Sequence, residues 1–283
     1  MNEYLIEVDE LHDILASGTV RLVDTRSEDE FNRSHIPGAV NIHDIFTYLC
    51  TRDTGGYPAL VQHFARLFGD AGIKPEDQVV IYEDAMDNGY GQSCRGWFLF
   101  KYLGQASARV LHGGYKAWLG KKLPLSRKPA ETQPLTYLAN PINNWMVTAD
   151  DMMKAIQSED VVIIDCRDYA EWVGANSSPY GYDYCPRKGR IPGARWIEWY
   201  RMMTRRNGIP WFKSSAEVTK VCEGVGITPE TTVYAYCFKG ARTSNTILAM
   251  KMAGFQDVRN YLCSWNEWSR DFSLPIDEDY PET

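Results

Sequence analysis

One cysteine stands in surroundings that would make its thiol reactive. Cys237 follows the apolar run 232–236, which predicts a buried strand, and precedes the run 245–253, which predicts a helix ending at Gly254. Backbone N–H groups in a loop between a strand and a helix turn toward the loop's centre, and the helix start adds partial positive charge. Such surroundings lower the pKa of a thiol, and the thiolate is its nucleophilic form.

The loop that follows this cysteine also carries two cations. Lys239 and Arg242 stand close to Cys237 in the stretch C-F-K-G-A-R-T-S, residues 237–244. Most free cysteines are buried and behave as small hydrophobic residues. The neighbouring cations favour a catalytic thiol over that interpretation.

The placement of the histidines narrows the chemistry. All five, at positions 12, 35, 43, 63 and 112, lie in the first half of the chain. A cysteine protease or acyltransferase needs an imidazole within hydrogen-bond reach of the sulfur. His43 is the least implausible of the five, but a plain loop residue is the better interpretation of it. Thiolate attack on a sulfane sulfur moves no proton at the reacting centre, so sulfur transfer suits Cys237.

The elements that position this loop occur twice along the chain. The segment 72–76, G-I-K-P-E, matches 226–230, G-I-T-P-E, and the segment 22–26, L-V-D-T-R, corresponds to 163–167, I-I-D-C-R. Each half alternates short apolar strands with amphipathic segments, such as 9–17 and 149–158. This alternation predicts an α/β fold in which each half is a mainly parallel sheet flanked by helices.

The repeat also sets the expected domain organisation. We expect a first domain over residues 1–122, a linker over 123–146 that contains four prolines, and a second domain over 147–283. A gap-free alignment of the repeats places Tyr82 on Tyr236 and Glu83 on Cys237. A carboxylate cannot accept a sulfane sulfur, so the first domain should be catalytically inactive. Cys94, which follows the first domain's loop, is expected to pack on a helix.

The loop at Cys237 resembles the six-residue active loop of rhodanese-type sulfurtransferases, and other motifs of that family stand around it. D-T-R at 24–26 with H-I-P-G-A at 35–39 is repeated as D-C-R at 165–167 with R-I-P-G-A at 190–194. The segment 261–268, Y-L-C-S-W-N-E-W, is similar to the family's closing G-S-W-x-E-W, with Cys263 in place of glycine. The resemblance covers almost the whole chain and implies two rhodanese-like domains, the second of them catalytic.

The resemblance implies roles for particular residues. Cys237 would carry sulfur as a persulfide, and the substrate would be held by Phe238, Lys239, Gly240, Ala241, Arg242, Thr243, Ser244 and Arg190. The pairs Asp24–Arg26 and Asp165–Arg167 are expected to be partly buried structural ion pairs that hold the Pro-Gly turns. The longer insert 173–189 would form a wall of the cleft or be a plain surface loop, and both interpretations stay open.

Composition excludes several classes of function. The net charge of −7 argues against general binding of nucleic acid or anionic membranes, and no apolar run is long enough to span a bilayer. Seven scattered cysteines without a C-x-x-C motif predict reduced thiols, no disulfide framework and no metal site. The chain start has neither a basic nor an apolar leader segment, so a cytoplasmic location is expected.

The resulting hypothesis is a sulfurtransferase that needs no cofactor. It would take sulfur from a small anionic donor, with thiosulfate preferred because of Lys239 and Arg242, and pass it to cyanide or a thiol. The alternatives are a 3-mercaptopyruvate sulfurtransferase, a phosphatase or arsenate reductase of related fold, and a non-catalytic sulfur-binding regulatory module. The loop has only four residues between Cys237 and Arg242, one fewer than such phosphatases carry. The sequence leaves the oligomeric state open.

Overall fold

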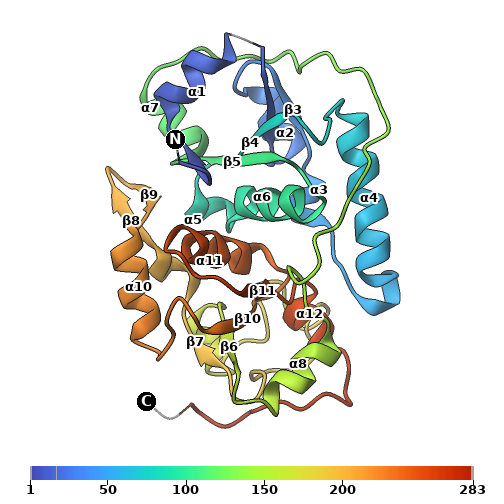
Figure 1. Cartoon of the computed structure of the whole chain (residues 1–283), viewed down its shortest axis with the longest axis vertical. Coiled ribbons are helices and arrows are strands. Elements are labelled where there is room, and N and C mark those ends of the chain that lie inside the picture. Colours follow the sequence, from blue (N-terminus) through green and yellow to red (C-terminus); the bar gives the residue numbers. More distant parts are fainter. Residues whose placement is uncertain (1, 17, 282–283) are drawn as a thin grey trace. The chain divides into compact units, whose positions relative to one another are not determined.

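The computed structural model describes residues 2–16 and 18–281 of the chain. The chain forms two compact units (Figure 1), and each is built from more than one segment. The first contains Met1–Tyr48, Tyr57–Ile142 and Thr204–Phe212, and the second contains Leu49–Gly56, Asn143–Met203 and Lys213–Thr283. Leu49–Gly56 thus belongs to the second unit although it lies in the first half of the sequence. Thr204–Phe212 belongs to the first unit although it lies in the second half.

The first unit contains a five-stranded sheet in the order β1-β5-β4-β2-β3, with every pair of neighbours parallel. Short apolar runs form its strands, as the alternation of strands and amphipathic segments predicts. The strands are β1 (Leu5–Ile6), β2 (Val20–Asp24), β3 (Ala39–Asn41), β4 (Gln78–Tyr82) and β5 (Ser107–Leu111). The helices are α1 (Val8–Leu15), α2 (Glu28–Arg33), α3 (Asp44–Thr47), α4 (Gly56–Asp70), α5 (Met86–Gly89), α6 (Gln92–Tyr102) and α7 (Gly114–Gly120).

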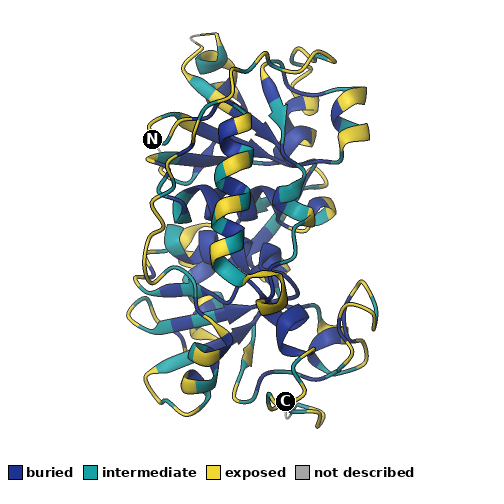
Figure 2. Ribbon diagram, turned by 90° about the vertical axis from the view of Figure 1, so that its right-hand side faces the viewer, coloured by how far each residue is buried: buried dark blue, intermediate teal, exposed yellow. Residues whose placement is uncertain are grey.

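Helices cover both faces of this sheet. On one face Tyr82 of β4 belongs to a buried cluster with Leu11 of α1 and Trp118 of α7. On the other face Gly96 of α6 lies so close to β4 that an added Cβ would be 2.9 Å from the Ile81 side chain. Helix α4, which faces the viewer in Figure 2, alternates buried and exposed residues as an amphipathic helix does.

The second unit repeats this plan with a four-stranded parallel sheet in the order β11-β10-β6-β7. Its strands are β6 (Val161–Asp165), β7 (Arg195–Trp196), β10 (Thr232–Tyr236) and β11 (Val258–Asn260). Its helices are α8 (Ala149–Ile156), α9 (Tyr169–Trp172), α10 (Ser215–Glu223), α11 (Ala241–Met252) and α12 (Ser264–Trp268). The hairpin of β8 (Met203–Arg206) and β9 (Ile209–Phe212) and two 3-10 turns, η1 (Arg52–Thr54) and η2 (Trp199–Met202), complete the chain. The expected fold, two mainly parallel sheets flanked by helices, is confirmed.

The pairing of strands shows the repeat directly. Asp24 of β2 lies opposite Tyr82 of β4, and Asp165 of β6 lies opposite Tyr236 of β10. The gap-free alignment that placed Tyr82 on Tyr236 therefore matches the three-dimensional register. The next residue in each repeat, Glu83 or Cys237, leaves the sheet at an equivalent position.

The proline-containing segment after α7 runs along the first unit. Its backbone exchanges hydrogen bonds with His35 through Ser126, and Leu135 and Asn140 donate to the carbonyl groups of Gly69 and Leu103. Backbone hydrogen bonds therefore attach residues 123–140 to the first unit at several points. The expected domain boundaries stay a prediction, because the two units also exchange the short segments named above.

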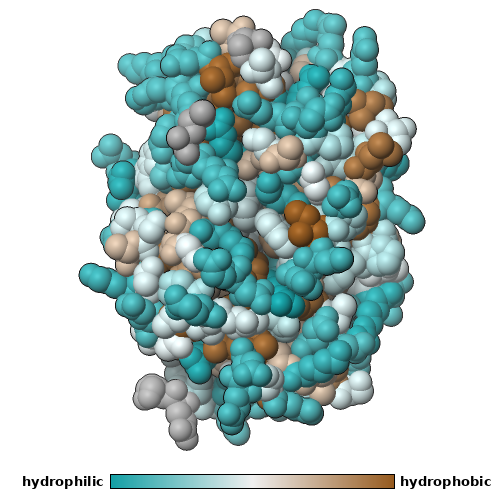
Figure 3. Space-filling view, viewed as in Figure 1, coloured by the Kyte–Doolittle hydropathy of each residue, from teal (hydrophilic) through white to brown (hydrophobic). Residues whose placement is uncertain are grey.

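The face of the molecule seen in Figure 3 is mostly hydrophilic, with hydrophobic residues in small separate groups. Among the helices in the described part of the chain, none combines the length and the apolar character that a membrane crossing requires.

Candidate active site

Cys237 lies between the end of β10 and the start of α11, at the carboxyl end of a central strand. Ligands of parallel α/β sheets bind at this edge. The backbone of Cys237 is fixed on both sides, because its N–H donates to Ser264 Oγ at 3.0 Å and its carbonyl accepts from Trp265 N–H at 3.0 Å. The residue is 1% exposed. The predicted strand and the placement of the cysteine at its end are confirmed.

The loop turns back over the sulfur of Cys237. The backbone N–H of Gly240 donates to Cys237 Sγ at 3.1 Å. Gly240 has φ of +86°, and a Cβ at this position would lie 2.8 Å from the Leu262 side chain. A glycine is therefore required both by the left-handed backbone and by the close approach of Leu262.

Helix α11 begins earlier than the sequence suggests. The predicted helix starts at residue 245, whereas α11 starts at Ala241, directly after the left-handed Gly240. Ser244 Oγ donates to the Gly240 carbonyl at 2.6 Å, which secures the first turn. Residue types alone do not separate 241–244 from the loop, because Thr243 and Ser244 are weak helix formers whereas Ala241 and Arg242 are strong ones. Arg242, Thr243 and Ser244 thus belong to the first turn of α11. Their backbone N–H groups point toward the amino end of the helix, which is the end that follows Cys237.

Opposing effects act on the pKa of Cys237, and the net direction is downward. Burial raises it, while the charge of Arg242, hydrogen bonding from Thr243 and the backbone N–H of Lys239 lower it. The pKa therefore lies below the ordinary value of a thiol although the residue is buried. A larger fraction of Cys237 is thiolate near neutral pH than in an ordinary cysteine.

Arg242 is held by two carboxylates that the sequence did not single out. Its Nη1 and Nη2 donate to Glu171 at 2.5 and 3.0 Å, and Nη1 also lies 3.1 Å from Asp168 Oδ1. Arg242 and Glu171 are both buried. Asp168 and Glu171 cap helix α9, and an Asp-x-x-Glu capping pattern directly after the D-C-R motif was the available signal. The guanidinium therefore holds the loop to helix α9, and the charges of Glu171 and Asp168 already balance its own charge.

The insert 173–189 contacts the loop through its aromatic side chains. The ring of Tyr180 lies 4.6 Å from that of Phe238, and Lys239 Nζ lies 5.1 Å from the centre of the Tyr180 ring. Tyr184 lies 6.3 Å from Phe238. Tyr180 and Tyr184 are exposed, whereas Phe238 and Lys239 are buried. Of the two interpretations left open for this insert, the wall beside the loop fits these contacts.

Two other residues named from the sequence lie in different surroundings. Arg190 Nη1 donates to the carbonyl of Asp279 at 2.7 Å, and its guanidinium lies 4.9 Å from the Trp172 ring. These contacts tie Arg190 to the C-terminal segment, and its substrate-binding role stays a prediction. His43, within the first unit, has its Nδ1 2.9 Å from the carbonyl oxygen of Thr25.

The two Asp-Arg pairs are structural, as expected, and more deeply buried than expected. Arg167 contacts Asp165 at 2.6 Å and donates to the Gly189 carbonyl at 2.7 Å. Arg26 contacts Asp24 at 2.6 Å and donates to the Ser34 carbonyl at 2.9 Å. Each arginine therefore fixes the segment that enters its Pro-Gly turn. None of these four side chains is more than 4% exposed.

The equivalent position in the first unit holds Glu83, which is completely buried. Ser93 donates to Glu83 Oε1 through its backbone at 3.2 Å and its hydroxyl at 2.5 Å, and Gln92 N–H donates to Oε2 at 3.3 Å. Burial raises the Glu83 pKa to about 7 against the lowering effect of these hydrogen bonds. The carboxyl group thus occupies the start of α6. Cys94, the neighbouring thiol, is buried on α6 as expected.

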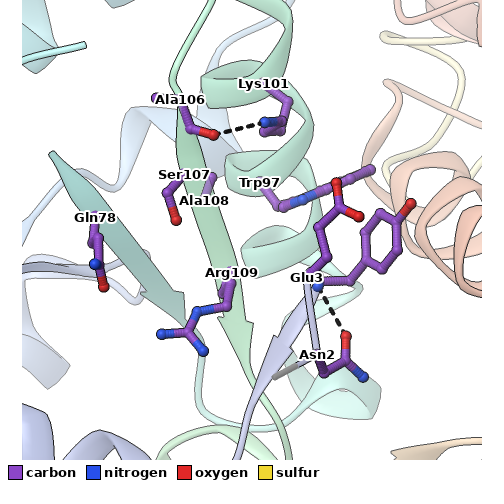
Figure 4. A pocket seen from close by; sticks show the side chains of 10 residues that line it. Asn2, Glu3, Gln78, Trp97, Lys101, Ala106, Ser107, Ala108 and Arg109 are labelled. Carbon is purple, nitrogen blue, oxygen red and sulfur yellow. Dashed lines mark hydrogen bonds between the residues drawn. The ribbon is translucent and has the colours of Figure 1, made fainter. Parts of the chain in front are cut away.

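A cavity of about 250 Å³ in the first unit has no such chemistry (Figure 4). Gln78 and Ser107, the first residues of β4 and β5, line it together with Trp97, Lys101 and Arg109. It therefore lies toward the amino ends of the strands, opposite the edge where parallel sheets bind their ligands. No cysteine or histidine is among its lining residues in the described part of the chain.

Comparison with known proteins agrees with the repeat and the loop. The chain is similar to the thiosulfate sulfurtransferase of Azotobacter vinelandii, with 27% identity over 96% of both chains. It is also similar to the 3-mercaptopyruvate sulfurtransferase of Mus musculus, with 28% identity over 84% of this chain and 78% of that protein. The wild-type structure of EanB superimposes with a TM-score of 0.84 at 25% identity, over 99% of this chain and 70% of EanB. The rhodanese-like domain profile matches residues 7–121 and 148–271, and the chain therefore belongs to the rhodanese-like domain family of sulfurtransferases.

Proposed function

We propose that this protein transfers a sulfane sulfur through a persulfide on Cys237. The Cys237 thiolate attacks the outer sulfur of a small anionic donor, a new S–S bond forms, and the donor's own S–S or C–S bond breaks. With thiosulfate the leaving group is sulfite, which carries away both negative charges of the donor. Cyanide or a thiolate then attacks the terminal sulfur and restores the Cys237 thiolate. The second repeat carries this chemistry, and the first is inactive because Glu83 replaces the thiol.

The observation that carries this proposal is the hydrogen bond from Gly240 N–H to Cys237 Sγ at 3.1 Å in a loop that lowers the pKa of the thiol. Preorganised backbone donors stabilise negative charge without reorganisation when that charge moves. The same donors at the start of α11 would face the terminal sulfur of a persulfide and the departing anion. Thr243 and Ser244 belong to this turn, and Phe238, Lys239 and Ala241 complete the substrate-binding set.

Thiosulfate is the donor that we propose, and Lys239 is the reason. Thiosulfate is a dianion whose charge lies close to the transferred sulfur, so it needs a cation near Cys237. Lys239 is two residues from Cys237, and its ammonium group lies beside Tyr180. Arg242 contributes less to this argument than its sequence position suggests, because Glu171 and Asp168 already match its charge.

A second donor, 3-mercaptopyruvate, is favoured by that same pairing. Two carboxylates on one guanidinium leave the neighbourhood of Arg242 without excess positive charge. A donor with a single carboxylate farther from its sulfur needs less local charge than thiosulfate does. The two donor hypotheses share the Cys237 persulfide and differ only in what Lys239 contributes.

The persulfide is tested by mass spectrometry of the intact protein. Incubation with donor should add the mass of one sulfur atom, and cyanide should remove it. Cys237→Ser should lose both the adduct and turnover, whereas Cys94→Ser should keep the adduct. Normal turnover by Cys237→Ser would show that another group carries the sulfur.

The donor is tested by steady-state kinetics with thiosulfate and with 3-mercaptopyruvate, using cyanide as the acceptor. Loss of one charge-assisted hydrogen bond costs roughly 1.5–3 kcal/mol, so Lys239→Ser should lower kcat/KM for thiosulfate about ten- to a hundredfold. Its effect on 3-mercaptopyruvate should be much smaller. A wild-type protein that prefers 3-mercaptopyruvate would contradict the assignment of thiosulfate as the donor, but it would not contradict the persulfide mechanism.

A further inference from the structure

Two thiols of the second unit face each other in its interior. Cys263 Sγ and Cys50 Sγ are 3.0 Å apart, and the residues are 4% and 2% exposed. Cys50 comes from the segment Leu49–Gly56, and Cys263 precedes helix α12, so 213 positions of sequence separate them. Cys263 also stands where the family resemblance predicts glycine. This pair is therefore a feature of the present chain and is distinct from Cys237.

One hydrogen bond joins the segments that carry these thiols, and a second holds its acceptor in place. The backbone N–H of Arg52 donates to Glu267 Oε1 at 2.9 Å, and Tyr261 OH donates to Glu267 Oε2 at 2.6 Å. The Arg52–Glu267 bond, with Glu267 oriented by Tyr261, holds the two segments together near the sulfur atoms without a covalent link. No group of metal-ligating side chains was found around the pair or elsewhere in the described residues. A thiol pair that the fold already holds together needs only a two-electron oxidant to become a disulfide.

We propose that Cys50 and Cys263 form an intramolecular disulfide when a small hydroperoxide oxidises them. One thiolate attacks the peroxide oxygen, the O–O bond breaks, and a sulfenic acid forms with release of water or an alcohol. The second thiol attacks that sulfur, an S–S bond forms, the S–O bond breaks, and water leaves. The two sulfurs are oxidised by two electrons in total, and the peroxide is reduced by the same two electrons.

A cavity adjoins the residue that follows Cys50, and neither thiol of the pair lines it. This cavity of about 280 Å³ is lined by Thr51 and Arg52, directly after Cys50, and by Glu267, which bonds to Arg52. The rest of its wall is formed by Asp53, Ala149, Arg270, Asp271, Phe272 and Leu274. The cavity is large enough to hold a hydroperoxide and lies within the second unit.

The disulfide would act on the Cys237 loop because Cys263 belongs to the segment on which that loop rests. Leu262, the preceding residue, packs against Gly240, and Ser264, the following residue, accepts the Cys237 N–H. Bond formation must bring the sulfurs about 1 Å closer, to the S–S length of about 2.05 Å. Ser264 already has a left-handed backbone with φ of +56°, so it has little freedom to absorb this movement alone. The displacement should therefore reach the donors around Cys237.

The disulfide is tested in the Cys237→Ser protein, where the proposed sulfur carrier is absent and sulfur transfer plays no part. Treatment with hydrogen peroxide should remove two hydrogen atoms, about 2 Da, and digestion without reductant should give a peptide linking Cys50 to Cys263. Adding Cys50→Ala or Cys263→Gly should abolish this product, and adding Cys222→Ala, another buried thiol, should preserve it. Absence of the linked peptide, or sulfinic acid at either position instead, would overturn the proposal.

The coupling to the loop is tested by amide hydrogen exchange on the same oxidised and reduced samples. Exchange of amides 237–244 should change by about fivefold, the equivalent of one neutral hydrogen bond. The Cys50→Ala background should show no such change after peroxide treatment. Unchanged exchange in a sample that contains the disulfide would refute the coupling, and it would leave the proposed sulfur transfer untouched.

Discussion

In the first repeat β4 ends at Tyr82 and is followed by Glu83, whereas in the second β10 ends at Tyr236 and is followed by Cys237. Both residues are buried; Glu83 accepts backbone hydrogen bonds at the start of α6, and Cys237 accepts one from Gly240, directly before α11. The carboxyl group of Glu83 itself occupies the space in front of the first backbone N–H groups of α6. The thiol of Cys237 is smaller, and in the proposed mechanism the helix start would receive the sulfur atom brought by a donor.

The two repeats also shift the pKa of the residue that follows the strand in opposite directions. Burial raises the pKa of Glu83 to about 7, so this group is substantially protonated near neutral pH. The charge of Arg242 and nearby hydrogen-bond donors lower the pKa of Cys237 although burial opposes them. The same scaffold thus neutralises an acid in one repeat and stabilises a thiolate in the other. The loop, and not the sheet, decides which of these happens.

The largest effect is expected when the cysteine is moved from position 237 to the equivalent position 83 of the first repeat. Glu83→Cys in the Cys237→Ser background should take up no sulfur from thiosulfate, because a thiol there would be buried without a matching Arg242. Intact mass after incubation with donor measures this directly. Glu83→Cys alone should add one sulfur atom, at Cys237, as the wild type does. A persulfide at position 83 would show that the scaffold alone activates a thiol.

The buried ion pairs should affect stability equally and activity unequally. Asp24→Asn and Asp165→Asn each leave a buried arginine without its partner, so each should lower the free energy of unfolding by about 3–5 kcal/mol. Only Asp165→Asn should also reduce sulfur transfer, because Tyr236, which precedes Cys237, donates to Asp165 at 2.6 Å. Chemical denaturation and steady-state rates measure the two quantities.

An exposed pair provides the control for these variants. Glu131 contacts Lys128 with both side chains more than three-quarters exposed, so Glu131→Gln should leave stability nearly unchanged. Equal losses of activity in Asp24→Asn and Asp165→Asn would contradict the division of roles between the repeats.

The raised pKa of Glu83 predicts a pH dependence of stability. Between the unfolded value of 4.5 and about 7 the folded protein binds more protons than the unfolded chain. The contribution of Glu83 is therefore fully present below pH 4.5 and declines as pH rises to about 7, by up to about 3 kcal/mol. Glu83→Gln should lack this decline. Unfolding free energies measured from pH 4.5 to 7.5 test it, and parallel curves for both proteins would refute it.

The smallest effect concerns the pKa of the active thiol. Arg242→Gln with Glu171→Gln removes the buried charged pair and leaves Asp168, whose side chain is 34% exposed, as the remaining carboxylate. The loss of the Arg242 charge should raise the Cys237 pKa and slow sulfur uptake about tenfold at a pH below the new pKa. The pH dependence of the uptake rate measures this shift. Glu171→Gln alone keeps the cation and should not raise the pKa, so an upward shift there would show that loop geometry dominates.

The α/β fold, the repeat and the position of the thiol at the end of a strand could be predicted from the order of residue types alone. Apolar runs such as 232–236 specify buried strands through local periodicity, and the alignment of Glu83 with Cys237 needs only the order of residues. The pairing of Asp165 with Arg167 was predictable because the two residues are close along the chain. The helix starts at Ala241, four residues before the predicted start, because the left-handed Gly240 and the hydrogen bond from Ser244 begin its first turn there.

The surroundings of the Cys237 loop depend on contacts between residues that are far apart in the sequence. Glu171 meets Arg242 across 71 positions of sequence, and Cys50 meets Cys263 across 213. Tyr180 reaches Lys239 from an insert whose own sequence specifies no regular element. Such contacts depend on how the chain returns to one edge of the sheet, and no local pattern of residue types encodes that path. The charge that matches Arg242, and with it the charge available to a donor, is therefore a property of the fold.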